Sequence, residues 1–130
     1  MKTAFVTGGT GFIGSRLIAL LIARGVQVRA LARSQAGLEK VNVDGVRNVI
    51  ETALEVGVPK IVFTSTVGVF GDTKGQIADE TFEHKGNFPT VYERTKCIAH
   101  YQVVLPFIEQ GAPIILVMPS AVFGPNDHST

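Results

Sequence analysis

The chain has little that would suit it to secretion, a membrane or nucleic acid. Its single cysteine, Cys97, cannot form an internal disulfide, which fits a reducing compartment. Twelve basic and eleven acidic side chains give a net charge of +1, so no field of one sign gathers nucleic acid or an anionic membrane surface. The longest apolar runs, Leu17–Ala23 and Ile114–Met118, are far shorter than the roughly 20 residues of a membrane span. The N-terminus runs into a strand pattern without a signal peptide. These absences predict a cytoplasmic protein with no nucleic-acid or membrane partner.

The composition favours a folded domain. Of the 130 residues, 45% are hydrophobic and 14 are glycine, which is enough apolar material for one core. We therefore expect a single domain over residues 1–130. The three histidines (His84, His100 and His128) are scattered without the spacing of metal ligands, so we expect no metal site.

Strand and helix patterns alternate along the chain. Apolar runs at residues 4–7, 26–32, 60–65 and 114–118 predict strands, and helical spacing at 12–24, 43–56 and 90–110 predicts helices. Pro106 should kink the last helix or end it early. Apolar strands that alternate with helices indicate an α/β fold with a parallel sheet covered on both faces. In such sheets, ligands bind beyond the carboxyl ends of the strands.

A glycine-rich turn follows the first strand. Gly8, Gly11 and Gly14 recur at intervals of three between that strand and the first helix. Gly8 would permit the tight turn, Gly11 would let backbone approach a pyrophosphate, and Gly14 would let the helix pack closely on the strand. Phe12 and Ile13 open the helix, whose N-terminal N–H groups and dipole favour phosphate. The turn predicts nucleotide binding, and a merely tight turn is the alternative.

The end of the second strand bears on the choice of nicotinamide cofactor. The strand runs into Arg33 and Ser34, and no acidic residue occurs before Glu39. A carboxylate there would bind the ribose 2′-hydroxyl of NAD, whereas Arg33 could pair with a 2′-phosphate and Ser34 could donate to it. The sequence thus favours NADP over NAD. If Arg33 is only a solvated residue at a strand end, NAD remains the alternative.

Tyr92 and Lys96 are four residues apart and so share one helix face. A tyrosine phenol, with a pKa of about 10, is a poor base at neutral pH. A nearby ammonium favours the phenolate, which can then exchange a proton with a substrate hydroxyl or carbonyl. Taken alone, such a pair is common on helix surfaces. Thr66, at the end of the third strand, could hydrogen-bond the substrate oxygen, although hydroxyls there also cap turns.

As a set, these segments resemble the extended short-chain dehydrogenase/reductases, the NAD-dependent epimerase/dehydratase family. Because of Arg33, the dihydroflavonol-reductase-like branch is the most similar. The matching segments are Thr7–Gly14, residues 41–48, Ser65–Gly71, Tyr92–Lys96 and Pro119–Pro125.

The resemblance assigns roles to particular residues. Tyr92 would be the proton donor or acceptor, Lys96 would lower its pKa and hold the nicotinamide ribose, and Thr66 would orient the substrate. Ser65, Pro119 and Val122 would lie against the cofactor, the last two where the family's backbone meets the nicotinamide carboxamide. Asn42 corresponds to an asparagine near the family's active site. Its alternative is a helix N-terminal cap.

The implied activity is hydride transfer by an NAD(P)-dependent reductase, epimerase or dehydratase. The substrate would be a small molecule with a hydroxyl or carbonyl, such as a sugar nucleotide or a flavonoid-like compound. A homo-oligomer is compatible with the resemblance. Two alternatives stay open, namely a non-catalytic nucleotide-binding module and an inactive fragment of such an enzyme.

The sequence departs from the family pattern at two places. The family has two further strands and their helices where Glu39-Lys40 here joins directly to Val41, and it continues into a substrate-binding domain after Gly124-Pro125. The expected fold is therefore a Rossmann-like doubly wound sheet of about four strands in the order 2-1-3-4, with helices on both faces and no C-terminal substrate domain. Apolar surface should be exposed where the missing region would pack.

Overall fold

The computed structural model describes residues 2–31, 40–82, 86, 88 and 90–125, and these form two compact units. The first unit comprises Met1–Ala36 with Phe123–Thr130, and the second comprises Gly37–Val122. Arg33 and Ser34 lie outside the described residues. None of the described helices is long and apolar enough to cross a membrane.

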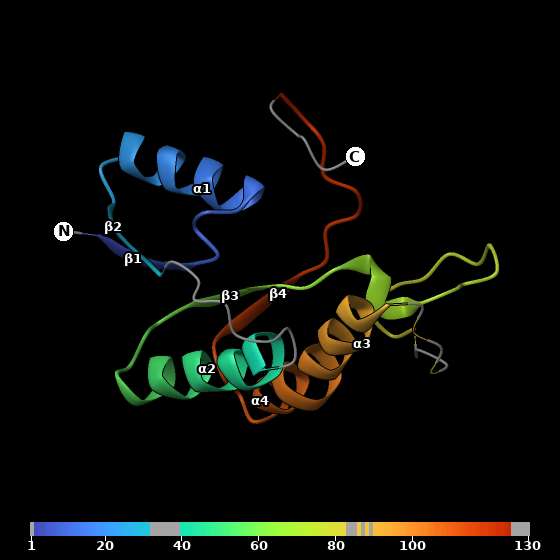
Figure 1. The fold of residues 1–130 in the computed structure, drawn as a ribbon. Helices are drawn as coiled ribbons and strands as arrows, with labels where there is room; N and C mark the ends of the chain where they lie inside the picture. Colours follow the sequence, from blue (N-terminus) through green and yellow to red (C-terminus); the bar gives the residue numbers. More distant parts are fainter. Residues whose placement is uncertain (1, 32–39, 83–85, 87, 89, 126–130) are drawn as a thin grey trace. The chain divides into compact units, whose positions relative to one another are not determined.

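The first unit is a strand–helix–strand motif (Figure 1). Strand β1 (Thr3–Thr7) pairs in parallel with β2 (Gln27–Leu31), and helix α1 (Phe12–Ala23) packs on both strands. The register aligns Thr3 with Gln27 and Thr7 with Leu31. Gly25, at a φ of 72°, follows α1 and takes the left-handed conformation that ends many helices. The predicted order of elements in this part of the chain is confirmed.

The second unit is a two-stranded parallel sheet with helices on one side (Figure 1). Its elements are the π-helical turn η1 (Lys40–Asp44), α2 (Gly45–Glu55), β3 (Ile61–Thr64), the 3₁₀ turn η2 (Val67–Phe70), α3 (Val91–Ile98), the π-helical segment η3 (Ala99–Val104), α4 (Leu105–Glu109) and β4 (Ile114–Val117). Strand β3 pairs with β4, aligning Ile61 with Ile114. The largest fully buried side chains among the described residues are Ile50, Val69, Thr95, Val103 and Val104.

The strands form two separate two-stranded sheets, β1-β2 and β3-β4. The α/β class with parallel strands is confirmed. The order 2-1-3-4 would pair β3 of the second unit with β1 of the first, and it stays a prediction.

Each sheet has one covered face and one open face. In β3 and β4, the half-buried residues (Ile61, Phe63, Ile114 and Leu116) alternate with exposed ones (Val62, Thr64, Ile115 and Val117). Phe5 in β1 is likewise 61% exposed. Neither unit taken by itself has helices on both faces of its sheet. Apolar residues are exposed on both sheets, and their link to the region missing from the family pattern stays a prediction.

The last helix continues past the point where Pro106 was expected to kink or end it. Proline lacks an N–H and cannot donate to the preceding turn. The chain meets this with the π-helical segment Ala99–Val104, after which Pro106 lies in the first turn of α4. At that position, a missing N–H costs little.

Candidate functional site

The glycine turn after β1 is closed by backbone alone. The N–H of Gly11 donates to the Gly8 carbonyl at 3.0 Å, and Gly8 has a φ of 67°, which favours glycine. A Cβ at Gly14 would lie only 2.2 Å from the Gly8 oxygen. Position 14 therefore accepts only glycine if the helix is to start this close to the turn. Three of the predicted cofactor residues thus form one tight backbone cradle.

Helix α1 begins in this cradle with no side-chain cap and no acidic residue in its first turn. The first N–H groups of a helix have no partner within it, and the dipole is positive at that end. Phe12 and Ile13 are the residues that carry these groups. This arrangement suits a pyrophosphate, because the donors are backbone N–H groups and no described side chain caps them.

Arg16 lies near the start of α1, and its contacts were not predicted from the sequence. Its guanidinium lies 5.4 Å from the centre of the Phe12 ring and donates to the carbonyl of Pro125. Gly124 also approaches Phe12, since a Cβ there would lie 3.6 Å from the ring. The spacing of four between Phe12 and Arg16 was a helical-face signal in the sequence. Pairing with Pro125, which is 109 residues away, was not readable from it.

In the second unit, the ends of β3 and β4 come together. The N–H of Ser65 donates to Val117 at 2.8 Å, and the N–H of Val67 donates to Pro119 at 3.2 Å, so the pairing continues past both strands. Ser65, Thr66 and Pro119 therefore share one edge, as predicted from the ends of parallel strands. Val122, further along the same unit, is 45% exposed.

Lys96 points from α3 to this strand end. Its ammonium donates to the Thr64 carbonyl at 2.8 Å and lies 5.2 Å from the centre of the Phe63 ring. Burial lowers the pKa of Lys96, because the charged form loses water. Tyr92, one turn earlier on α3, is 49% exposed. Helix α3 thus holds a hydrogen-bonded cation at the strand end and a half-exposed tyrosine one turn away.

Thr66 caps a turn, which was the alternative to its predicted contact with the substrate oxygen. Its hydroxyl oxygen accepts from the N–H of Gly68 at 3.2 Å and caps η2. The oxygen accepts in that bond, so the hydroxyl proton stays available for a second partner. Capping and orienting a substrate are therefore compatible at this residue.

Asn42 does not cap a helix. It lies within η1, and its amide donates to the Thr95 hydroxyl at 3.0 Å, which in turn donates to the Tyr92 carbonyl at 3.0 Å. The capping alternative is wrong, because the chain is already helical at Asp44, the residue before α2. Asn42 instead braces the first turn of α3, which carries Tyr92.

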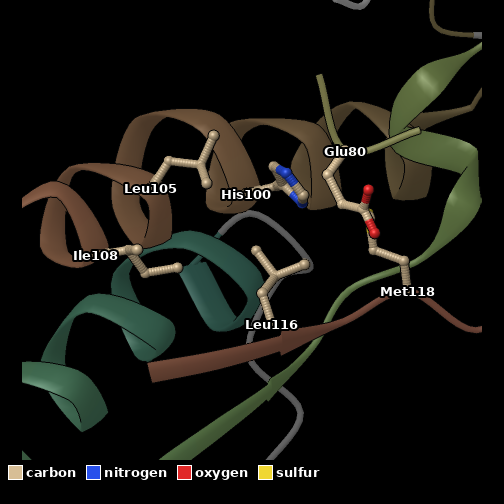
Figure 2. A pocket seen from close by; sticks show the side chains of 6 residues that line it. All are labelled: Glu80, His100, Leu105, Ile108, Leu116 and Met118. Atoms are coloured by element: carbon tan, nitrogen blue, oxygen red, sulfur yellow. The ribbon is translucent and has the colours of Figure 1, made fainter. Parts of the chain in front are cut away.

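A buried Ser65–His100 pair was also missed from the sequence. The Ser65 hydroxyl and Nδ1 of His100 are 2.9 Å apart, and both residues are buried. His100 is also one of six residues that line a hollow of about 260 Å³ (Figure 2), namely Glu80, His100, Leu105, Ile108, Leu116 and Met118. Cys97 is buried, and burial raises the pKa of its thiol, which fits packing rather than nucleophilic chemistry.

A glycine turn that opens a helix, parallel strands and a lysine fixed at a strand end define a Rossmann-type fold. A profile of the 3-beta hydroxysteroid dehydrogenase/isomerase family matches residues 32–130, and one of the NAD dependent epimerase/dehydratase family matches residues 4–40. The chain belongs to the 3-beta hydroxysteroid dehydrogenase/isomerase family, within the extended short-chain dehydrogenase/reductases. The family resemblance stated from the motifs is confirmed.

Curated relatives agree with this assignment. A candidate dihydroflavonol 4-reductase of Synechocystis sp. is 30% identical over 174 residues, covering 95% of this chain and 50% of the relative. Sterol demethylase protein B of Methylococcus capsulatus is 28% identical over 174 residues, covering 96% of this chain and 53% of the relative. The chain thus spans about half the length of these relatives.

Solved structures share the fold. The gox2253 structure matches with a TM-score of 0.75 at 28% identity, covering 97% of this chain and 53% of the other. UDP-glucuronic acid 4-epimerase from Bacillus cereus, in complex with NAD, matches with a TM-score of 0.74 at 17% identity, covering 98% of this chain and 59% of the other. A GDP-L-fucose synthetase from Naegleria fowleri, bound to NADP, matches with a TM-score of 0.65 at 20% identity, covering 97% of this chain and 52% of the other.

The alignments also bear on the internal joint. Both curated alignments run over 174 positions, which exceeds the 130 residues of this chain, so the relatives have residues without a counterpart here. The two family profiles meet at residues 32–40, where Glu39-Lys40 joins Val41. These findings agree with an internal shortening relative to the family.

Proposed function

We propose that this chain is the dinucleotide-binding part of an NAD(P)-dependent short-chain oxidoreductase, with residues 1–130 forming one cofactor-binding domain. The observation that carries the proposal is the glycine cradle, in which a Gly14 Cβ would lie 2.2 Å from the Gly8 oxygen at an uncapped helix start. A turn that served only to reverse the chain would not need a helix to begin there without a side-chain cap. Gly8, Gly11 and Gly14, with Phe12 and Ile13, would hold the pyrophosphate through backbone N–H groups.

The acid–base chemistry would fall to Tyr92. Its phenol would exchange a proton with the substrate oxygen, and Lys96 would favour the phenolate. Thr66 would donate its remaining hydroxyl proton to the same oxygen. The bound nicotinamide supplies or takes the hydride, while Lys96, Ser65, Pro119 and Val122 would contact the cofactor. The half-exposed Tyr92 side chain and the Lys96–Thr64 bond support these roles.

Arg33 and Ser34 would set the preference for NADP. A guanidinium pairs well with a 2′-phosphate, and no carboxylate precedes Glu39 to repel it. The relatives' names point to flavonoid and sterol compounds, and the structural neighbours to sugar nucleotides. The substrate class we propose is accordingly a small molecule with a hydroxyl or ketone, on a flavonoid-like, sterol-like or sugar-nucleotide scaffold.

Calorimetry with NADPH and NADH on the full chain tests cofactor binding. We expect NADPH to bind more tightly than NADH. Arg33→Ala should reduce this preference by roughly 10- to 150-fold, since one charge-assisted contact is worth about 1.5–3 kcal/mol. Equal NADPH and NADH affinities before and after the change would remove the NADP preference. A folded chain that binds neither cofactor would contradict the proposed function.

Turnover separates an enzyme from a non-catalytic cofactor-binding module. The chain is assayed with NADPH against a dihydroflavonol, a 3-ketosteroid and a 4-keto sugar nucleotide. Tyr92→Phe should abolish turnover and leave cofactor affinity nearly unchanged. Tyr101→Phe is a matched control, because Tyr101 is the chain's other tyrosine and its hydroxyl bonds to the Phe82 carbonyl at 3.3 Å instead. Cofactor binding without turnover on any substrate would favour the module.

A further inference from the structure

His100 is a buried ionisable residue that the proposed chemistry does not use. It is 5% exposed and lies in η3, one helical turn after Lys96. Its ring projects from the helix into the hollow beside Leu116 and Met118 (Figure 2). Its Nδ1 atom pairs with the hydroxyl of Ser65, which is 3% exposed. A buried polar pair of this kind is costly to leave unmatched.

Two side chains from one helix hold two consecutive residues of the strand end. Lys96 donates to the Thr64 carbonyl, and His100 pairs with the Ser65 side chain. On the other edge, the Ser65 N–H is held by the Val117 carbonyl. The strand end is therefore fixed from the helix and from the neighbouring strand, immediately before Thr66.

We infer that His100 is a positioning residue that acts through Ser65. It fixes the end of β3, so that the Thr64 carbonyl stays in place as the acceptor for Lys96 and Thr66 stays at the site's edge. The inference rests on the proposed function only in taking this edge as part of the cofactor and substrate site.

The surroundings keep the ring neutral. Burial lowers the pKa of His100, and the charge of Lys96 lowers it further. The other groups that face it are Glu80 across the hollow and the Tyr101 ring, whose centre lies 4.6 Å away. A neutral imidazole has one donor and one acceptor nitrogen, and a serine hydroxyl matches either. The pair can therefore persist without a charge.

The titration of Lys96, followed by NMR of isotopically labelled lysine side chains in the full chain, tests the inference without cofactor. His100→Leu removes the pair, and Ser65→Ala removes it with a smaller change in the core. Leucine is more apolar than histidine, so burial alone would lower the pKa of Lys96 further. Release of the strand end would instead hydrate Lys96 and raise it. We expect a rise in both variants.

Rescue and a matched control complete the design. His100→Asn places an amide near the Nδ1 position and should restore the wild-type titration, while Tyr101→Phe, on the same helix, should leave it unchanged. An unchanged or lowered Lys96 pKa in Ser65→Ala, or failure of Asn to rescue, overturns the inference. If His100→Leu does not fold, Ser65→Ala still decides.

Cofactor affinity provides a second measurement that tells the two proposals apart. If NADPH binds, His100→Leu and Ser65→Ala should weaken it several-fold, and His100→Asn should restore it. If the wild-type chain binds no dinucleotide, the proposed function fails, and the Lys96 titration still decides the role of His100. If the pKa of Lys96 rises in His100→Leu and Ser65→Ala while their NADPH affinity stays at the wild-type value, the link between the strand end and the site is overturned.

Discussion

Buried polar side chains in this molecule are matched in pairs. Ser65 bonds to His100, and Asn42 bonds to Thr95. Among the described residues, no buried side-chain polar atom lacks a hydrogen-bond partner. Such pairs fix geometry, because breaking one leaves an uncompensated donor or acceptor that costs about 1–3 kcal/mol.

The lowered pKa of His100 makes stability depend on pH. In the unfolded chain, the imidazole has its ordinary pKa of about 6.5, so below that pH the unfolded state binds more protons than the folded state. Stability should therefore fall as the pH drops from 6.5 to the lower pKa of the folded state, and then stay level. Urea unfolding at a series of pH values measures this.

His100→Asn is the control for this prediction, because it keeps a polar partner for Ser65 and removes the titration. The acid-induced loss of stability should be smaller in this variant than in the wild type. The same slope in both proteins would mean that other groups cause the pH dependence.

The sequence predicted the arrangements that depend on local spacing. Gly8, Gly11 and Gly14, and the pair Tyr92–Lys96, lie within one turn or one helix, so their spacing alone placed them. The Ser65–His100 and Asn42–Thr95 bonds join residues 35 and 53 positions apart. Nothing local in the sequence marks such partners, because they depend on how a helix packs against a strand end.

At the scale of elements, helix α3 is set by its N-terminal cap. The Thr90 hydroxyl accepts from the Glu93 N–H at 3.1 Å, and the Glu93 carboxylate accepts from the Thr90 N–H at 3.0 Å. This reciprocal arrangement is a capping box, and Thr90-Val91-Tyr92-Glu93 carries its sequence signature. The cap fixes the first turn, in which Tyr92 lies.

Removing this cap should destabilise the chain and loosen α3. Thr90→Ala is expected to cost about 1 kcal/mol of unfolding free energy and to speed hydrogen exchange of the amides at positions 92–94. Thr90→Ser keeps the hydroxyl and should behave like the wild type. Equal exchange rates in the alanine and serine variants would show that the cap does not hold the first turn.

Element positions followed from periodicity, and element detail did not. The helix expected at 12–24 is Phe12–Ala23, and the strand expected at 60–65 is Ile61–Thr64. The π-helical segment before Pro106 was not expected, since apolar spacing has no marker for a wider turn and proline usually ends a helix. The structure shows that a wider turn can absorb the missing N–H.

At the scale of the whole molecule, the order of the strands is the part of the fold that the sequence specifies least. Neighbouring strands were inferred from family order, and a pairing between strands distant in sequence has no local signal. What the sequence did predict is the consequence of a thinner sheet, namely exposed apolar residues. Val62 is 59% exposed and Ile115 46% exposed, and they align with each other across β3 and β4.

This open strand face should drive self-association. Val62→Lys and Ile115→Lys together should weaken it several-fold, because two charges would have to be buried in the contact. Sedimentation velocity over a range of concentrations measures the change. Val56→Lys is the control, since Val56 is 72% exposed at the end of α2, outside the strands. If the control reduces association equally, the open strand face is not the contact.

The π-helical segment Ala99–Val104 lies between α3, which carries Lys96, and α4. Each α-helical residue advances by about 100°, so a single residue more or fewer in this segment rotates everything after it by more than a quarter turn. Before the segment, Lys96 faces the strand end. After it, Leu105 and Ile108 face the hollow. The length of this segment therefore sets which residues after it face the hollow while Lys96 faces the strand end.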